Sequence, residues 1–195
     1  PFWDAERGCY VEYHRDFRPV EGGEGTGVRD IVRCTSDDFI NWSEPEWLKY
    51  PGAPDEHLYT NQINPYPRAP HIYMGFPKRF MPDRRIFEHE YAGLSDAVFM
   101  SSRDGLSFKR WGEAFIRPGP QPERWLNRNN MINCGFVQTA SPYAGTPDEQ
   151  SFYSIESYYR GSNCAMRRFT LRLDGFVSLQ APLAGGEALS RPLIV

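Results

Sequence analysis

The fold of this chain is decided by the stretch at residues 101–111, which reads SSRDGLSFKRW. An apolar run, residues 97–100, precedes it, and the aromatic residues Phe108 and Trp111 follow it. The dipeptide Asp104-Gly105 stands between these runs, and Asp-Gly between apolar runs is a strong signal for a tight turn joining two antiparallel strands. The stretch therefore predicts a β-hairpin.

Two further stretches repeat the plan of the hairpin. Residues 31–45, IVRCTSDDFINWSEP, have the same order of strand, Ser, Asp, aromatic and Trp, and residues 166–179, MRRFTLRLDGFVSL, form a weaker copy. Ser36 precedes Ser102 by 66 residues, and Asp104 precedes Asp174 by 70. A unit of ~65–70 residues with about four strands is typical of a long β-propeller blade rather than of a solenoid turn.

The composition also predicts an all-β chain, organised as one partial propeller domain. Aromatic residues make up 15% of the 195 residues, with 17 Gly and 17 Pro, which suits short strands joined by turns. The repeat divides the chain into blades of about 1–54, 55–122 and 123–185. Three blades cannot close a propeller, and the chain opens on Pro1, so we expect a piece of a longer protein whose missing blades are its partners.

Charge and cysteine spacing argue against several classes of function. The formal net charge is −3 and the pI about 5.9, so no basic field favours nucleic acid. No stretch approaches the ~18 apolar residues of a membrane span. The four cysteines lack C-x-x-C spacing, and Glu88, His89 and Glu90 offer no fixed geometry, so we expect no metal and no cofactor. A disulfide between Cys9 and Cys34, free thiols, and the cellular compartment all stay open.

Polar side chains are expected to meet at one rim of the blades. With four up-and-down strands, the start of the first, the end of the second and the start of the third lie at the same rim, and the Asp-Gly turns lie at the other. The residues placed at the shared rim are Arg15, Asp16, Arg29 and Asp30 from the first blade, Glu56, His57, Asn61, Lys78, Arg79 and Asp96 from the second, and Arg128, Asn129 and Glu156 from the third.

Carboxylates, cations and amides around one axis suit a ligand rich in hydroxyl groups, which points to a carbohydrate. Cleavage of a glycosidic bond needs a protonated acid and a second carboxylate ~5 to ~9 Å away. Asp30, Glu56, Asp96 and Glu156 are the catalytic candidates. Asp30 beside Arg29 suits the ionised role, and Glu156 beside Ile155 suits the role with the raised pKa. The substrate-binding candidates are Arg15, Arg29, His57, Asn61, Lys78, Arg79, Arg128 and Asn129, of which Arg15, Lys78, Arg79 and Arg128 suit a carboxylated or sulfated sugar.

The turns resemble those of five-bladed propeller glycosidases, glycoside hydrolase families 32 and 43 and uncharacterised bacterial relatives. The resemblance rests on residues 102–108, SRDGLSF, and residues 35–42, TSDDFINW, and covers most of the chain at the level of blades. It implies a five-bladed propeller hydrolysing glycosidic bonds. Arg29-Asp30-Ile31 is similar to the Arg-Asp-Pro element of family 32, with Ile31 in place of Pro. The family's nucleophile segment is not found, so it lies in the missing part or is absent.

Simpler structural roles compete with each of these assignments. Asp37, Asp104 and Asp174 are interpreted as turn residues, since Asp side chains bond to their own turn backbone. Asp30 next to Arg29 also fits a structural ion pair, and His57 a hydrogen-bonding role. The rival functions are a non-catalytic carbohydrate-binding propeller and a structural or interaction propeller. A close carboxylate pair in an open pocket would favour the enzyme, and carboxylates each held by an Arg would favour the rivals.

Overall fold

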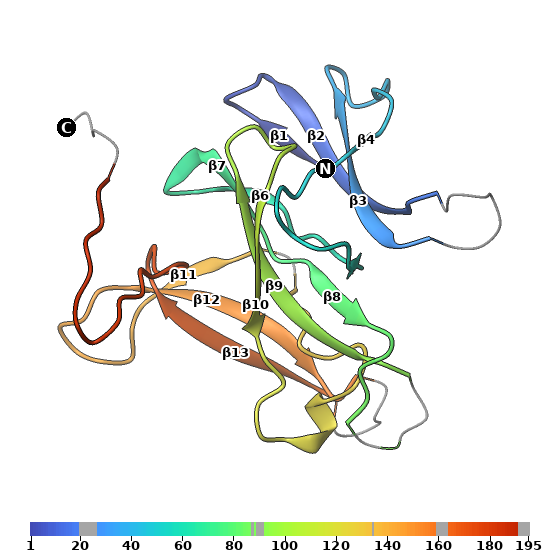
Figure 1. Cartoon of the computed structure of the whole chain (residues 1–195). Helices are drawn as coiled ribbons and strands as arrows, with labels where there is room; N and C mark the ends of the chain where they lie inside the picture. The colour runs from blue at the N-terminus through green and yellow to red at the C-terminus, as the bar shows by residue number, and fades with distance from the viewer. Residues whose placement is uncertain (20–26, 87, 89–91, 134, 159–163, 191–195) are drawn as a thin grey trace.

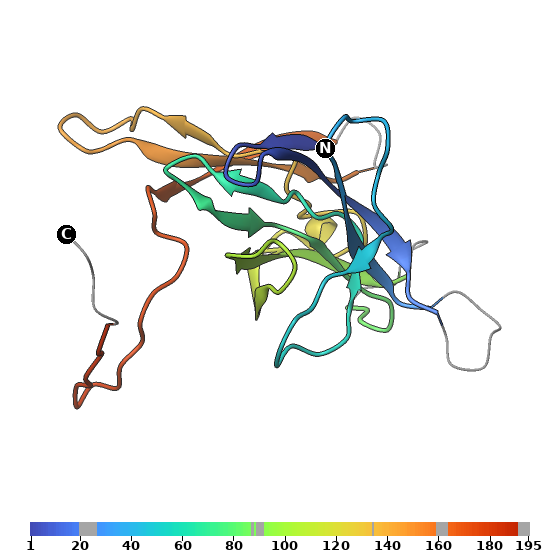
Figure 2. The same cartoon turned by 90° about the horizontal axis from the view of Figure 1, so that it is seen from above.

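A computed structural model describes residues 1–19, 27–86, 88, 92–133, 135–158 and 164–190. Its strands form three antiparallel sheets, and its single described helical segment is one 3-10 turn, η1 (Pro122–Arg124). Figures 1 and 2 show the three sheets following one another along the chain. The prediction of an all-β chain is confirmed, whereas the described residues form no closed ring. No helix among the described residues is long and apolar enough to cross a membrane.

The first sheet contains β1 (Phe2–Asp4), β2 (Cys9–Phe17), β3 (Arg29–Ser36) and β4 (Glu46–Trp47), in that order. β2 and β3 pair from Tyr10–Ser36 to Phe17–Arg29. Their register places the end of β2 beside the start of β3. Cys9, Cys34 and Cys164 are free thiols, and Cys134 lies outside the described residues.

The second sheet contains β5 (His57–Leu58), β6 (Asn64–Tyr66), β7 (Ala69–Gly75), β8 (Lys78–Met81), β9 (Leu94–Ser102) and β10 (Lys109–Ile116). β7 and β8 both pair with β9, and β5 and β6 pair with β8 and β7 respectively. The six strands therefore form four rows: β10, then β9, then β7 and β8 end to end, and then β6 and β5. Pro77 separates β7 from β8, because proline has no N–H to donate to the ladder.

The third sheet contains β11 (Val137–Thr139), β12 (Glu149–Glu156) and β13 (Ala165–Arg172). A bridge between Ile132 and Ser154 extends its first row. The fourth strand expected after Asp174-Gly175 is not formed, since described residues 173–190 contain no strand. Phe176 still stacks on Phe99 of the second sheet. Beyond it the segment, which holds Pro182 and the pair Gly185-Gly186, leaves the sheets as an extended tail (Figure 1). The assignment of the three sheets as propeller blades stays a prediction.

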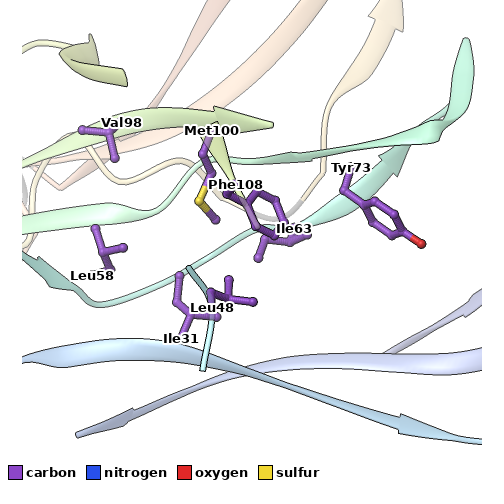
Figure 3. Close-up of a cluster of buried hydrophobic side chains, with 8 residues drawn as sticks. All are labelled: Ile31, Leu48, Leu58, Ile63, Tyr73, Val98, Met100 and Phe108. Carbon is purple, nitrogen blue, oxygen red and sulfur yellow. The ribbon is translucent and has the colours of Figure 1, made fainter. Parts of the chain in front are cut away.

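One hydrophobic core fills the space between the first and second sheets. Figure 3 shows Ile31 of β3 and Leu48, which directly follows β4, facing Leu58, Val98 and Met100 of the second sheet. A second core lies between the second and third sheets, where Phe76 and Phe99 pack against Ile132 and Phe152. β9 alternates between the two, with Val98 and Met100 in the first core and Ala97 and Phe99 in the second. The second sheet is thus buried on both faces.

The two Ser-Asp turns have the same geometry. The Oδ1 atom of Asp104 accepts from the backbone N–H groups of Leu106 and Ser107, at 2.8 and 2.7 Å. The Oδ1 atom of Asp38 accepts from those of Ile40 and Asn41, also at 2.8 and 2.7 Å. The turn carboxylate of the first copy is therefore Asp38, not Asp37. Phe39 takes a left-handed φ of 67° where Gly105 has 68°.

The Asp174 turn differs from these two. Its carboxylate accepts from Tyr66 Oη at 2.5 Å and from Arg68 Nε at 3.0 Å. Asp174 therefore ties the end of the third sheet to the second sheet instead of organising a Ser-Asp turn.

Candidate functional site

A pocket of about 420 Å³ lies where segments of all three sheets meet. Arg29 begins β3, Lys78 and Phe80 belong to β8, and Arg128 precedes the third sheet. Its remaining lining residues are Tyr59, Asn127, Met131 and Tyr158. Arg29, Lys78 and Arg128 are rim residues expected from the sequence, one from each repeat, and they line one pocket.

The lining of this pocket is cationic. Three further pockets of about 380, 410 and 420 Å³ each include at least one carboxylate: Glu113 in one, Asp96 and Glu113 in another, Asp148 and Glu149 in the last. The pocket of Arg29, Lys78 and Arg128, hereafter the basic pocket, has none among its described lining residues. It therefore favours an anionic ligand.

Tyr59 lies against two of the three cations of the basic pocket, and against Arg15 beside them. The Nζ atom of Lys78 and the Cζ atom of Arg15 each lie 4.5 Å from the centroid of the Tyr59 ring, and Arg29 Cζ lies 5.8 Å from it. A cation over an aromatic face is attracted by the ring quadrupole. The ring thus lies close to three like charges, of which Arg29 and Lys78 line the basic pocket.

The loops that reach the basic pocket have unusual backbone conformations. Arg128, Asn130 and Ser157 have φ values of 71°, 60° and 52°, in the left-handed region that non-glycine residues seldom adopt. Buried hydrogen bonds hold the first loop: Asn130 Nδ2 donates to the carbonyls of Ser95 and Arg124, at 2.9 and 3.0 Å. Strained backbone held by its surroundings is frequent at ligand sites.

Lys78 is the buried cation of the pocket, with 4% of its surface exposed. Burial, and then the charges of Arg128 and Arg29, lower its pKa from 10.5 to about 8. No described residue forms an ion pair with Lys78. The charged form of Lys78 is therefore disfavoured in the fold.

Replacement of Lys78 by methionine is expected to stabilise the fold at neutral pH. Between pH 8 and 10.5 the unfolded chain binds more protons at Lys78 than the folded chain does, so the stability of the natural chain rises with pH in that window. The destabilisation caused by the buried charge of Lys78 is fully present below pH 8. A shift of this size corresponds to roughly 3 kcal/mol, so we expect Lys78→Met to gain ~1–3 kcal/mol near pH 7.

Urea unfolding of both chains near pH 7 and near pH 10 measures this effect. The gain should shrink at the higher pH. Lys49→Met, at an exposed lysine, is the matched control and should change stability little. Equal stabilities of the natural chain and Lys78→Met at neutral pH would contradict a destabilising buried charge at Lys78.

The four candidate carboxylates lie outside the lining of the basic pocket, and each is bound by arginine. Asp30 is buried, with Oδ2 accepting from Arg18 Nε at 2.5 Å and Oδ1 accepting from Tyr50 Oη at 3.0 Å. Its hydrogen bonds therefore run to Arg18 and Tyr50 rather than to its sequence neighbour Arg29.

Glu56 and Asp96 share a single guanidinium. Arg79 Nη2 donates to Asp96 Oδ2 at 2.7 Å, and Arg79 Nη1 donates to Glu56 Oε1 at 3.1 Å. Arg110 also donates to Glu56. The structure brings these two candidates together, but as ligands of a buried arginine that is itself 8% exposed.

Glu156 lies between two arginines. Its Oε1 atom is 3.1 Å from Arg124 Nε and 2.7 Å from Arg167 Nε, although neither contact has hydrogen-bond geometry. This surrounding of positive charge differs from the apolar setting expected from Ile155. The catalytic roles of the four carboxylates stay predictions.

The other predicted binding residues are spread around the basic pocket. His57 Nδ1 accepts from the backbone N–H of Arg29 at 3.1 Å, and burial, with the charge of Arg29, lowers the pKa of His57. Asn61 Nδ2 donates to the carbonyl of Tyr13 at 3.0 Å and so links the first two sheets. Asn129 is fully buried and lies next to Arg128 without lining the pocket. These three residues contact segments next to the basic pocket and do not line it.

Sequence reasoning missed five residues that line the basic pocket, namely Tyr59, Phe80, Asn127, Met131 and Tyr158. Tyr59 and Phe80 follow predicted rim residues by two positions, so strand alternation places them on the same face as His57 and Lys78. The two-residue period of a strand could therefore have identified Tyr59 and Phe80 from the sequence. Asn127 and Tyr158 lie in loops, where no period applies.

Within the described residues, no group of three or more His, Cys, Asp or Glu side chains is arranged to hold a metal ion. The cluster Glu88, His89 and Glu90 falls partly outside those residues, because only Glu88 is described.

Comparison with known proteins gives one likeness in structure. No protein-family model matches the chain. No curated protein matches it in sequence. The chain is similar in structure to an N-acetylgalactosamine deacetylase from F. plautii, solved in complex with blood group B trisaccharide, with a TM-score of 0.52 and 14% identity. The match covers 80% of this chain and 39% of that protein, so the chain spans about two-fifths of its length. At this identity the likeness concerns the fold alone.

Proposed function

We propose that the basic pocket binds a carbohydrate carrying a negative charge, such as a uronic acid or a sulfated sugar. The proposal includes an architecture, in which the three sheets are blades of a five-bladed β-propeller and the pocket lies at its axis. The observation that carries it is the lining of the pocket, where Arg29, Lys78 and Arg128 converge without a carboxylate among the described residues.

The chemistry of the lining supports this class of ligand. Guanidinium groups bind carboxylate and sulfate oxygens through two parallel N–H bonds. The aromatic rings of Tyr59, Phe80 and Tyr158 offer apolar surface beside the cations, as the C–H face of a sugar ring needs. The solved deacetylase of similar fold is in complex with a trisaccharide, which is consistent with a carbohydrate-related function.

Glycoside hydrolysis has weaker support than binding. It needs one carboxyl group that carries a proton and a second that is ionised, both facing the substrate. Asp30, Glu56, Asp96 and Glu156 each lie against at least one arginine, and a neighbouring positive charge favours the ionised form. The binding function is therefore the one that this geometry supports best.

Calorimetric titration with methyl glycosides tests the proposal. Methyl galacturonide and a sulfated methyl galactoside are expected to bind, and neutral methyl galactoside to bind at least about tenfold more weakly, since a charged hydrogen bond contributes roughly 1.5–3 kcal/mol. Arg29→Gln should weaken binding of the uronide by about tenfold or more. Arg33→Gln is the matched control, because Arg33 lies on the same strand and pairs with Glu46 instead of facing the pocket.

The proposal fails if the charged and neutral glycosides bind equally, or if none binds. Equal binding would mean that the pocket recognises a sugar without its charge, and absence of all binding would favour a structural or interaction propeller. Retained folding of each variant is checked by its urea midpoint.

A further inference from the structure

The basic pocket contains an amine where this chain would ordinarily place a guanidinium. The sequence has 19 arginines and three lysines, Lys49, Lys78 and Lys109. Lys49 and Lys109 are exposed, and Lys78 is buried at the pocket. For charge alone an arginine would serve as well, but a guanidinium stays protonated and is a poor nucleophile, whereas an amine that loses its proton can attack a carbonyl carbon.

The surroundings of Lys78 favour the neutral amine. The charged groups facing it are Arg29 from β3 and Arg128 from the loop before the third sheet, with Arg15 of β2 on the shared Tyr59 ring. His57, on the adjacent strand β5, accepts from the backbone of Arg29. No described carboxylate pairs with Lys78, and its pKa lies near 8. A lysine next to another cation in a desolvated pocket is the arrangement that activates amines for imine formation.

We propose that Lys78 forms a reversible imine with a 2-oxo acid, such as a sugar acid with a carbonyl group next to its carboxylate. The inference rests on the proposed function, in which the pocket binds an anionic group. Arg29 and Arg128 would bind the carboxylate of the 2-oxo acid, and Lys78 would react at the carbonyl carbon next to it. The two arginines flank the amine, so a ligand with carboxylate and carbonyl on adjacent carbons presents both groups to the same pocket.

The step balances without an oxidant or reductant. The lone pair of Lys78 Nζ forms a bond to the carbonyl carbon, and the carbonyl oxygen takes up a proton to give a carbinolamine. Loss of that hydroxyl as water, together with the second nitrogen proton, forms the C=N double bond. Water addition reverses the sequence and releases the ligand.

Reductive trapping tests the inference directly. The full chain is incubated with pyruvate and sodium cyanoborohydride near pH 8, digested, and examined by mass spectrometry for the reduced adduct on each lysine. We expect labelling of Lys78 at least about tenfold above Lys49 and Lys109, which report the background rate of exposed amines. Acetone, which has the carbonyl but no carboxylate, should label Lys78 far less.

Two variants separate reactivity from anion binding. Lys78→Met should abolish the excess labelling while keeping a cooperative unfolding transition. Arg29→Gln should reduce labelling by pyruvate toward the level with acetone, and Arg33→Gln should leave it unchanged. Equal labelling of the three lysines, or equal labelling of Lys78 by pyruvate and acetone, would overturn the inference.

The outcome is independent of the binding test described above. Methyl galacturonide has a blocked carbonyl carbon and cannot form an imine, so its binding reports the proposed function alone. If it binds and Lys78 stays unlabelled, the imine is wrong and the binding function stands. If Lys78 is labelled selectively and the uronide does not bind, the imine stands and the carbohydrate function fails.

Discussion

Arg79→Met is expected to lower the free energy of unfolding by about 3–5 kcal/mol, because it leaves two carboxylates without their shared partner. Arg79 binds Asp96 through Nε and Nη2, at 3.0 and 2.7 Å, and reaches Glu56 and the carbonyl of Gly112 through Nη1. Asp96 is 3% exposed, so an unpaired charge there cannot be solvated. Loss of one member of such a buried group costs far more than loss of a surface pair.

Urea unfolding of the variant measures this loss. Arg117→Met is the matched control, because Arg117 meets Glu113 at 3.9 Å on the exposed surface, and it should change stability by less than about 0.5 kcal/mol. Adding Asp96→Asn to Arg79→Met removes the unpaired charge of Asp96 and should recover part of the loss, while Glu56 keeps its contact with Arg110. No difference between Arg79→Met and Arg117→Met would refute the buried network.

Phe76→Ala is the second large effect, with an expected loss of about 3–5 kcal/mol. Phe76 is 1% exposed, and its ring centroid lies 5.1 Å from that of Phe152, 5.2 Å from that of Phe115 and 5.5 Å from that of Phe99. Truncation would open a cavity between the second and third sheets and remove several aromatic contacts at once.

Thermal or urea unfolding of Phe76→Ala measures that loss, with Tyr143→Ala as the control at an aromatic residue that is 71% exposed. A change of less than about 1 kcal/mol for Phe76→Ala would mean that the two sheets are not packed on each other as described. Because Arg79 and Phe76 lie on opposite sides of Pro77, the two variants also test separate regions of the same strand row.

The local elements of this fold could be predicted because local interactions form them. Asp104 binds the backbone of its own turn, so the residues within a few positions decide that hairpin without reference to the rest of the chain. The same signal locates the first copy, although the carboxylate that binds its turn backbone is that of Asp38 and not that of Asp37. The apolar run at residues 97–100 likewise predicts a buried strand. Successive side chains of a strand point to opposite faces, so Ala97 and Phe99 face one core and Val98 and Met100 face the other.

The missing strand after Asp174 shows where a repeat misleads. Asp174-Gly175 has the sequence of a hairpin turn, but its carboxylate bonds to Tyr66 and Arg68 of the second sheet, far away in the chain. A turn forms a hairpin only if the segment that follows pairs with the strand before it, and the described residues 176–190 form no strand.

The site shows the same division between local and distant interactions. Arg29, Lys78 and Arg128, which the sequence predicts at one rim, line one pocket. The partners of the carboxylates could not be predicted from the sequence. Asp30 bonds to Arg18 rather than to Arg29, and Arg79 binds both Glu56 and Asp96. The sequence determines which strands and turns form, since those interactions join residues near in the chain. Which charge neutralises which depends on side-chain direction and burial across sheets, and these exist only once the sheets have packed.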